Sequence, residues 1–176
     1  DWCENRWGRV IVTLDAHKDM AMPPLPRLGI MLPVERSMRH VTYYGYGPDE
    51  SYIDKREHCY VDMFQAEVED LHENYIRPQE NGSHYHCRYV SLENEKYRLL
   101  AEADNYLDFN VSDYTVEELA GKRHNFELEP ASGSLLSLDA RMMGIGSNSC
   151  GPDLPEEFLR DEAHTVWKVQ LQIEEL

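Results

Sequence analysis

The sequence is poor in cysteine and has no long apolar run. Its four cysteines, Cys3, Cys59, Cys87 and Cys150, form no C-x-x-C pair. Such spacing does not indicate a disulfide framework or a zinc ribbon, so we expect free thiols in a reducing, cytoplasmic compartment. No apolar run approaches the roughly 18 residues that a membrane-spanning helix needs, so the chain is expected to be soluble.

Positive charge is also scarce. The chain has 17 Lys and Arg against 33 Asp and Glu, and its formal net charge is −16 at pH 7. Such a surface repels phosphates, so neither nucleic acid nor an anionic membrane is an expected partner. The length of 176 residues and the 41% hydrophobic content predict a single folded domain over residues 1–176. The chain begins at Asp1, which we interpret as a processed end or a piece of a longer protein.

Alternation of apolar and polar residues is the dominant pattern. It predicts strands around Val10–Leu14, Leu28–Leu32, Tyr85–Val90, Leu107–Val111, Phe126–Leu128 and Trp167–Ile173. Clusters of glycine, proline, asparagine and serine separate these runs, as turns do. Many short strands with such turns are typical of an all-β antiparallel sandwich.

One short helix is predicted after Thr115. Thr115 and Glu118 match a capping box, and Gly121 ends the apolar run. The segment from Val61 to Leu71 stays ambiguous, because its apolar residues fit either a helix or an irregular strand.

Several residues that could bind a ligand or take part in catalysis have simpler structural interpretations. His84 and His86 would share one face of a strand, but two imidazoles fall short of the three or four ligands of a metal site, so hydrogen-bonded histidines are favoured. Runs of acids such as Glu67–Asp70 and Glu156–Glu157 are typical of solvated surface. Tyr43, Tyr44, Tyr46 and Tyr52 could stack on a sugar, but core positions are favoured.

Several segments together resemble one family. They are Leu25-Pro26-Arg27-Leu28-Gly29-Ile30, the run from Val41 to Asp54 with its Gly45-Tyr46-Gly47-Pro48-Asp49-Glu50, Tyr75–Gly82 with Pro78-Gln79-Glu80-Asn81-Gly82, Asp108–Ser112, and Leu138–Gly146 with Met143-Gly144-Ile145-Gly146. In order and spacing they resemble the C-terminal, small-chain domain of bacterial β-galactosidases of glycoside hydrolase family two.

This resemblance implies a fold and a role. The fold would be a galactose-mutarotase-like supersandwich, present here without its first strands and with one short helix. The parent enzyme would hydrolyse terminal β-D-galactosides with retention, and this segment would be structural and line the aglycone side of the active site. The family's catalytic glutamates and its magnesium and sodium ligands match no position in this chain, so the segment alone is expected to be inactive and to hold no cofactor.

The resemblance also implies a site in the loop after Gly146. Family members carry a tryptophan there, against which the aglycone sugar stacks. Aligning Gly151 and Pro152 places Cys150 at that position, with Asn148 and Ser149 as candidate polar contacts. A thiol offers a sugar less apolar area than an indole, so weaker or different binding of the leaving sugar is expected.

Partners and rival functions remain open. The implied partners are the galactoside substrate and the parent's catalytic barrel and other domains, in cis or as a separate large subunit. Missing strands would leave a sheet edge or apolar face that invites self-association. A stand-alone carbohydrate-binding or aldose-epimerase-like sandwich, with His86 and Glu80 facing a sugar, is the main alternative. A purely structural interaction domain is a third.

Overall fold

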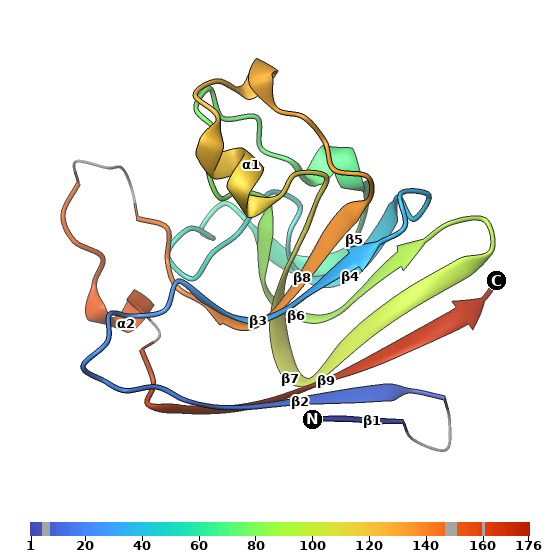
Figure 1. The fold of residues 1–176 in the computed structure, drawn as a ribbon, viewed down its shortest axis with the longest axis horizontal. Helices are drawn as coiled ribbons and strands as arrows, with labels where there is room; N and C mark the ends of the chain where they lie inside the picture. Colours follow the sequence, from blue (N-terminus) through green and yellow to red (C-terminus); the bar gives the residue numbers. More distant parts are fainter. Residues whose placement is uncertain (5–7, 147–150, 160) are drawn as a thin grey trace.

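The computed structural model describes residues 1–4, 8–146, 151–159 and 161–176 (Figure 1). In these ranges the chain forms nine strands, and every pairing between them is antiparallel. The strands are β1 (Trp2–Glu4), β2 (Val10–His17), β3 (Arg27–Val34), β4 (His40–Gly47), β5 (Tyr60–Glu67), β6 (Ser83–Glu93), β7 (Tyr97–Ser112), β8 (Ser134–Met142) and β9 (His164–Glu175). The all-β prediction is thereby confirmed, as an open, sandwich-like sheet.

The sheet divides along the long strand β7. Residues 97–103 of β7 pair with β9, which continues to β2 and β1, whereas residues 108–112 pair with β8, which continues to β3. The opposite edge of β7 pairs with β6, followed by β4 and β5. We call β2 and β9 the β2–β9 arm and β3 and β8 the β3–β8 arm; Figure 1 shows them diverging from β7.

The core fills the space where these strands curve over one another. It contains fully buried side chains from both parts of the sheet, among them Tyr43, Phe109, Leu136, Leu138 and Val169. The predicted alternation of β9 is confirmed at Trp167, Val169 and Leu171, which are buried. The same pattern was wrong at Ile173, which is 72% exposed near the end of its strand.

Short helices lie in the connections between the strands. They are α1 (Val116–Gly121), α2 (Glu156–Leu159) and the 3₁₀ helices η1 (Val68–Leu71) and η2 (Asn125–Glu127). The Thr115 hydroxyl accepts a hydrogen bond from the Glu118 N–H at 3.0 Å, which confirms the predicted cap. The Glu118 carboxylate instead accepts from the Glu129 N–H at 2.8 Å and so connects α1 to a later loop.

Three predictions of local structure need correction or completion. The predicted strand at Phe126–Leu128 was wrong, because η2 occupies this segment and Phe126 is exposed. The single predicted helix is accompanied by α2, whose Glu156 and Glu157 had been interpreted only as surface acids. The ambiguous segment is a strand followed by a 3₁₀ turn, β5 and then η1, and Val68 and Leu71 of η1 are buried.

Candidate functional site

The β3–β8 arm is closely packed at the start of β3. The register of the two strands shifts between Leu28 and Gly29. A Cβ atom at Gly29 would lie 2.2 Å from the Leu138 carbonyl oxygen, so only glycine permits this approach. The close approach places the Arg27 side chain against Asp139 of β8.

Arg27 links two carboxylates. Its Nη2 donates to Asp139 Oδ2 at 2.6 Å, its Nε to Asp139 Oδ1 at 3.3 Å, and its Nη1 to Glu80 Oε2 at 3.3 Å. The Asp139 side chain is only 3% exposed. Burial raises the pKa of Asp139 and of Glu80, and the nearby guanidinium of Arg27 opposes that rise. Arg27 therefore offsets charge that would otherwise be costly to bury.

A second polar cluster centres on the buried Glu50. Its carboxylate accepts hydrogen bonds from the Gly82 N–H at 2.7 Å, from the Tyr75 hydroxyl and from the Lys55 ammonium. Lys55 also donates to the Tyr75 hydroxyl at 2.9 Å. Burial opposes the charge on Lys55, but the hydrogen bonds to Glu50 and Tyr75 prevail and raise the pKa of Lys55 above its ordinary value. Burial, together with Glu50, raises the pKa of Tyr75.

Asp54 anchors the segment that leads out of β8. Its carboxylate accepts from the Ile145 N–H at 3.1 Å and from the Gly146 N–H at 2.8 Å. Gly144 lies so close that an added Cβ would be 2.5 Å from the Asp54 carboxyl carbon, and its N–H donates to the Phe158 carbonyl at 2.9 Å. Gly146 has a φ of +73°, which favours glycine. This turn is therefore held by a specific carboxylate.

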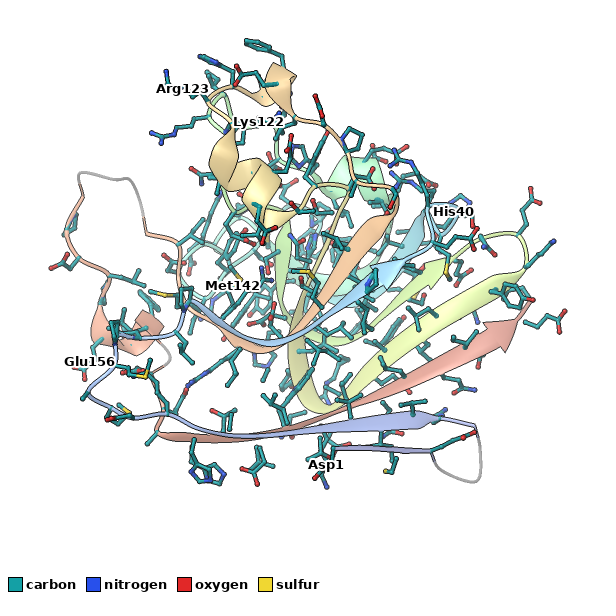
Figure 2. The ribbon with its side chains drawn as sticks, in the orientation of Figure 1. Asp1, His40, Lys122, Arg123, Met142 and Glu156 are labelled. Atoms are coloured by element: carbon teal, nitrogen blue, oxygen red, sulfur yellow. The ribbon has the colours of Figure 1, made fainter. Side chains whose placement is uncertain are left out.

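These groups border an open cleft of about 1110 Å³. Its walls come from the turn after β4, the segment before β6, the end of α1 and the segment that carries α2, where Figure 2 labels Glu156. Charged, aromatic and apolar groups share the lining, namely Asp54, Lys55, Tyr75, Arg77, Ile145, Gly146, Pro152 and Phe158. Such a mixture suits a polar ligand that also presents an apolar face.

The predicted loop residues Asn148, Ser149 and Cys150 lie outside the described residues. Gly146, before this segment, and Pro152, shortly after it, both line the cleft. Sequence reasoning singled out the segments 41–54 and 75–82 but gave no role to Asp54 or Tyr75 within them, or to Lys55 directly after the first. An acid and a tyrosine inside those segments, with a lysine beside them, were the available signal.

His84 and His86 do not share one face as predicted. The register of β6 against β7 shifts between His84 and Cys87, and His86 has a φ of +58°. His84 is fully buried, with its ring 4.9 Å from that of Phe109, and burial lowers the pKa of His84 to about 4. His86 instead packs its ring against Tyr106 at 3.5 Å. The β-bulge separates the two environments.

The pair nominated for an epimerase-like reaction is not brought together in one cavity among the described residues. Glu80 is held by Arg27 and borders a small cavity beside β3, whereas His86 borders cavities lined by Tyr85 and Tyr106.

The tyrosines predicted for the core divide into two groups. Tyr43 and Tyr52 are buried, as predicted. Tyr44 is 40% exposed, and Tyr46 is partly buried with the guanidinium of Arg56 5.7 Å from its ring centre.

The fold and the cleft together define an all-β, sandwich-like unit with a polar and aromatic cleft at one end of the β3–β8 arm. Comparison with known families makes this more specific. Residues 2–172 match the family described as beta galactosidase small chain, and the chain belongs to that family.

Curated relatives agree with this assignment. A beta-galactosidase of Actinobacillus pleuropneumoniae is 40% identical over 151 residues, which are 86% of this chain and 15% of that protein. A beta-galactosidase of Staphylococcus xylosus is 37% identical over 171 residues, or 97% of this chain and 17% of the relative. A beta-galactosidase of Arthrobacter is 34% identical over 167 residues, which are 91% of this chain and 16% of that protein. The chain thus spans about a sixth of the length of these relatives.

Among the described residues, no helix has both the length and the apolar character to cross a membrane.

Proposed function

We propose that this chain is the small-chain segment of a larger, cytoplasmic bacterial β-galactosidase that hydrolyses terminal β-D-galactosides with retention. The observation that carries the proposal is the family match over residues 2–172. The relatives named beta-galactosidase align with nearly all of this chain through only 15–17% of their own length, which supports a segment within a larger enzyme.

The role of the segment in this proposal is structural. The bond-breaking glutamates, and the magnesium and sodium ions, belong to other parts of the parent, and the catalytic barrel is the main partner, in cis or as a separate large subunit. This chain contributes scaffold and one wall of the pocket, at the aglycone side.

The anchored turn after β8 is the part of the cleft best suited to form that wall. Asp54 holds the N–H groups of Ile145 and Gly146, so the loop that follows starts from a defined position. In the proposal, Asn148, Ser149 and Cys150, which follow this turn in the sequence, contact the leaving-group sugar. The thiol of Cys150 offers that sugar a smaller apolar surface than an indole would.

The test is Cys150→Trp in the full-length protein that contains this chain. We expect kcat/KM for lactose to rise relative to that for an aryl β-galactoside, because only lactose has a sugar leaving group that can stack on the indole. Cys3→Trp, at an exposed cysteine on β1, is the matched control and should leave the ratio unchanged. An unchanged ratio in Cys150→Trp would count against the proposed wall.

A second test separates the segment from a stand-alone sugar-binding or epimerase-like domain. The isolated chain is titrated with galactose and lactose, and anomer interconversion of galactose is followed by polarimetry. The proposal expects neither tight binding nor catalysed interconversion; either would favour the alternative.

The edge strand β5 is the surface proposed for contact with other parts of the assembly. Tyr60, Val61 and Met63 are 47–59% exposed along it, and β5 stands at one end of the strand order. Exposed apolar edge strands favour pairing, so we expect the isolated chain to self-associate. Light scattering that shows a clean monomer at high concentration would contradict this expectation.

A further inference from the structure

Two histidines and an aspartate meet on the outer end of the β2–β9 arm. His17 is the last residue of β2 and His164 the first of β9, and they are direct cross-strand partners. Asp15 precedes His17 by two residues, so it lies on the same face of β2. All three side chains are exposed.

The three side chains present their ligand atoms to one another. His164 Nε2 lies 2.8 Å from Asp15 Oδ1, and His17 Nε2 lies 3.6 Å from the same oxygen. One ligand atom from each residue falls within 4.8 Å of the other two. With Zn–N bonds of about 2.0–2.1 Å, neighbouring ligands of a tetrahedral zinc ion lie about 3.4 Å apart. Around such an ion, His164 Nε2 and Asp15 Oδ1 would move slightly apart, and His17 Nε2 and Asp15 Oδ1 slightly together. These are small shifts of exposed side chains.

We propose that Asp15, His17 and His164 form a binding site for a divalent transition-metal ion, with zinc as the reference ion. The donor set selects this class, because imidazole suits zinc, nickel, copper and cobalt, whereas magnesium and calcium prefer sites made of oxygen ligands. Three protein ligands leave the fourth position of a tetrahedral ion to water. The site lies on the arm that does not border the cleft, and the inference is independent of the proposed function.

Metal binding requires the imidazole rings of His17 and His164 to change their orientation. They are stacked with centres 4.0 Å apart and planes only 7° apart. An imidazole nitrogen binds a metal through a lone pair in the plane of its ring, so both rings must tilt toward a common point. Their exposure allows this rotation without disturbing the core.

The strand ends surrounding the cluster are already aligned. The Lys18 N–H donates to the Ala163 carbonyl at 2.9 Å, and the Lys18 ammonium lies 2.8 Å from Asp161 Oδ1. A metal ion at the cluster would thus join β2 to β9 at their paired ends. Since the ion binds the folded arrangement and the unfolded chain holds no such site, binding stabilises the fold.

The test measures zinc binding to the intact protein that contains this chain, after removal of metal with a chelator and dialysis. Isothermal titration with Zn²⁺ is compared between wild type, His17→Ala, His164→Ala and the double variant. We expect one saturable site fewer in the double variant, and affinity at that site weakened by more than about tenfold in each single variant. Titration with Co²⁺ gives a second readout, through the visible absorption of the bound ion, which should be lost in the same variants.

His40→Ala is the matched control. His40 is an exposed histidine on β4 that contacts the Glu67 carboxylate on the neighbouring strand, and it lies well away from β2 in Figure 2. His40 and Glu67 offer one imidazole and one carboxylate, whereas the proposed site has two imidazoles and one carboxylate. Replacement of His40 should therefore leave zinc and cobalt binding unchanged.

The histidine variants isolate the site, because both side chains are exposed and lie outside the core. Zinc should raise the unfolding temperature of the wild type more than that of the double variant. Equal numbers of sites in wild type and double variant, or an equal loss in His40→Ala, would overturn the proposal.

Discussion

The β2–β9 arm buries apolar side chains and leaves its charges in water, whereas the β3–β8 arm buries charges as well. On β9, Trp167, Val169 and Leu171 face the core, and the ion pairs of the arm are exposed, as at Asp15 and His164. On β3 and β8, by contrast, Arg27 pairs with the buried Asp139. A strand that only packs can follow simple alternation. A strand that positions a cleft must also satisfy polar groups inside the protein.

The difference is sharpest between two arginines that each link two carboxylates. Arg27 joins Asp139 and Glu80, and the Asp139 side chain is only 3% exposed. Arg98, on the half of β7 that pairs with β9, joins Glu93 and Glu174, which are 23% and 36% exposed. Arg27→Met should lower the free energy of unfolding by about 3 kcal/mol, because it leaves a buried carboxylate without its partner. Arg98→Met should cost less than about 1 kcal/mol. Urea denaturation of both variants is the measurement, and equal costs would remove the distinction between the arms.

The buried His84 contrasts with the exposed histidines of the β2–β9 arm in its effect on stability. Burial lowers the pKa of His84 to about 4, whereas an unfolded histidine titrates near its ordinary 6.5. Between these values the unfolded state binds more protons than the folded state, so stability falls as pH drops from about 6.5 to about 4. The contribution of His84 to this loss is at most about 3 kcal/mol.

The pH effect is measured by urea denaturation at pH 7 and pH 5, for wild type and His84→Phe. The phenylalanine ring keeps the stacking on Phe109 but cannot take up a proton, so the variant should lose less stability on acidification. An identical pH dependence in the two proteins would show that His84 is not the group responsible.

Asp54 tests whether the turn after β8 depends on the carboxylate that accepts its N–H groups. Asp54→Ala removes the acceptors for the Ile145 and Gly146 N–H groups and should cost about 1–3 kcal/mol. Hydrogen exchange at these two amides should accelerate. Asp62→Ala, at an exposed aspartate on β5 whose carboxylate accepts from the neighbouring Met63 N–H, should have little effect on stability. Unchanged exchange at Gly146 would mean that Asp54 does not hold the turn.

The smallest effect is expected on the β2–β9 arm. In metal-free buffer, His164→Ala should change the free energy of unfolding by less than about 0.5 kcal/mol, because the ion pair with Asp15 is exposed. Thermal unfolding with a chelator present measures this value. A cost above about 2 kcal/mol would contradict the view that the exposed charged groups of this arm add little to its stability.

The sequence predicts regular strands better than irregular ones. Alternation identifies β2, β3 and most of β9, because apolar and polar residues alternate along each strand. It does not reveal the bulge at His86, where positive φ breaks the period of two. Nor does it show that β7 changes partner from β9 to β8 along its length, since pairing depends on contacts distant in sequence.

The roles of the residues in the candidate site also depend on contacts that are distant in sequence. Local motifs placed Glu50, Asp54 and Tyr75 in recognisable segments, but their roles arise only when the turn after β4 meets the segments before β6 and after β8. A carboxylate that accepts N–H groups from residues more than ninety positions away leaves no local pattern.

The central claim is that this chain supplies scaffold and one wall of a pocket whose chemistry resides elsewhere. Its most direct test compares the purified chain with the full-length protein that contains it, both assayed for hydrolysis of lactose and an aryl β-galactoside. The account predicts turnover by the full-length protein and none by the chain. Turnover by the chain alone, or a full-length protein that leaves both galactosides intact, would contradict it.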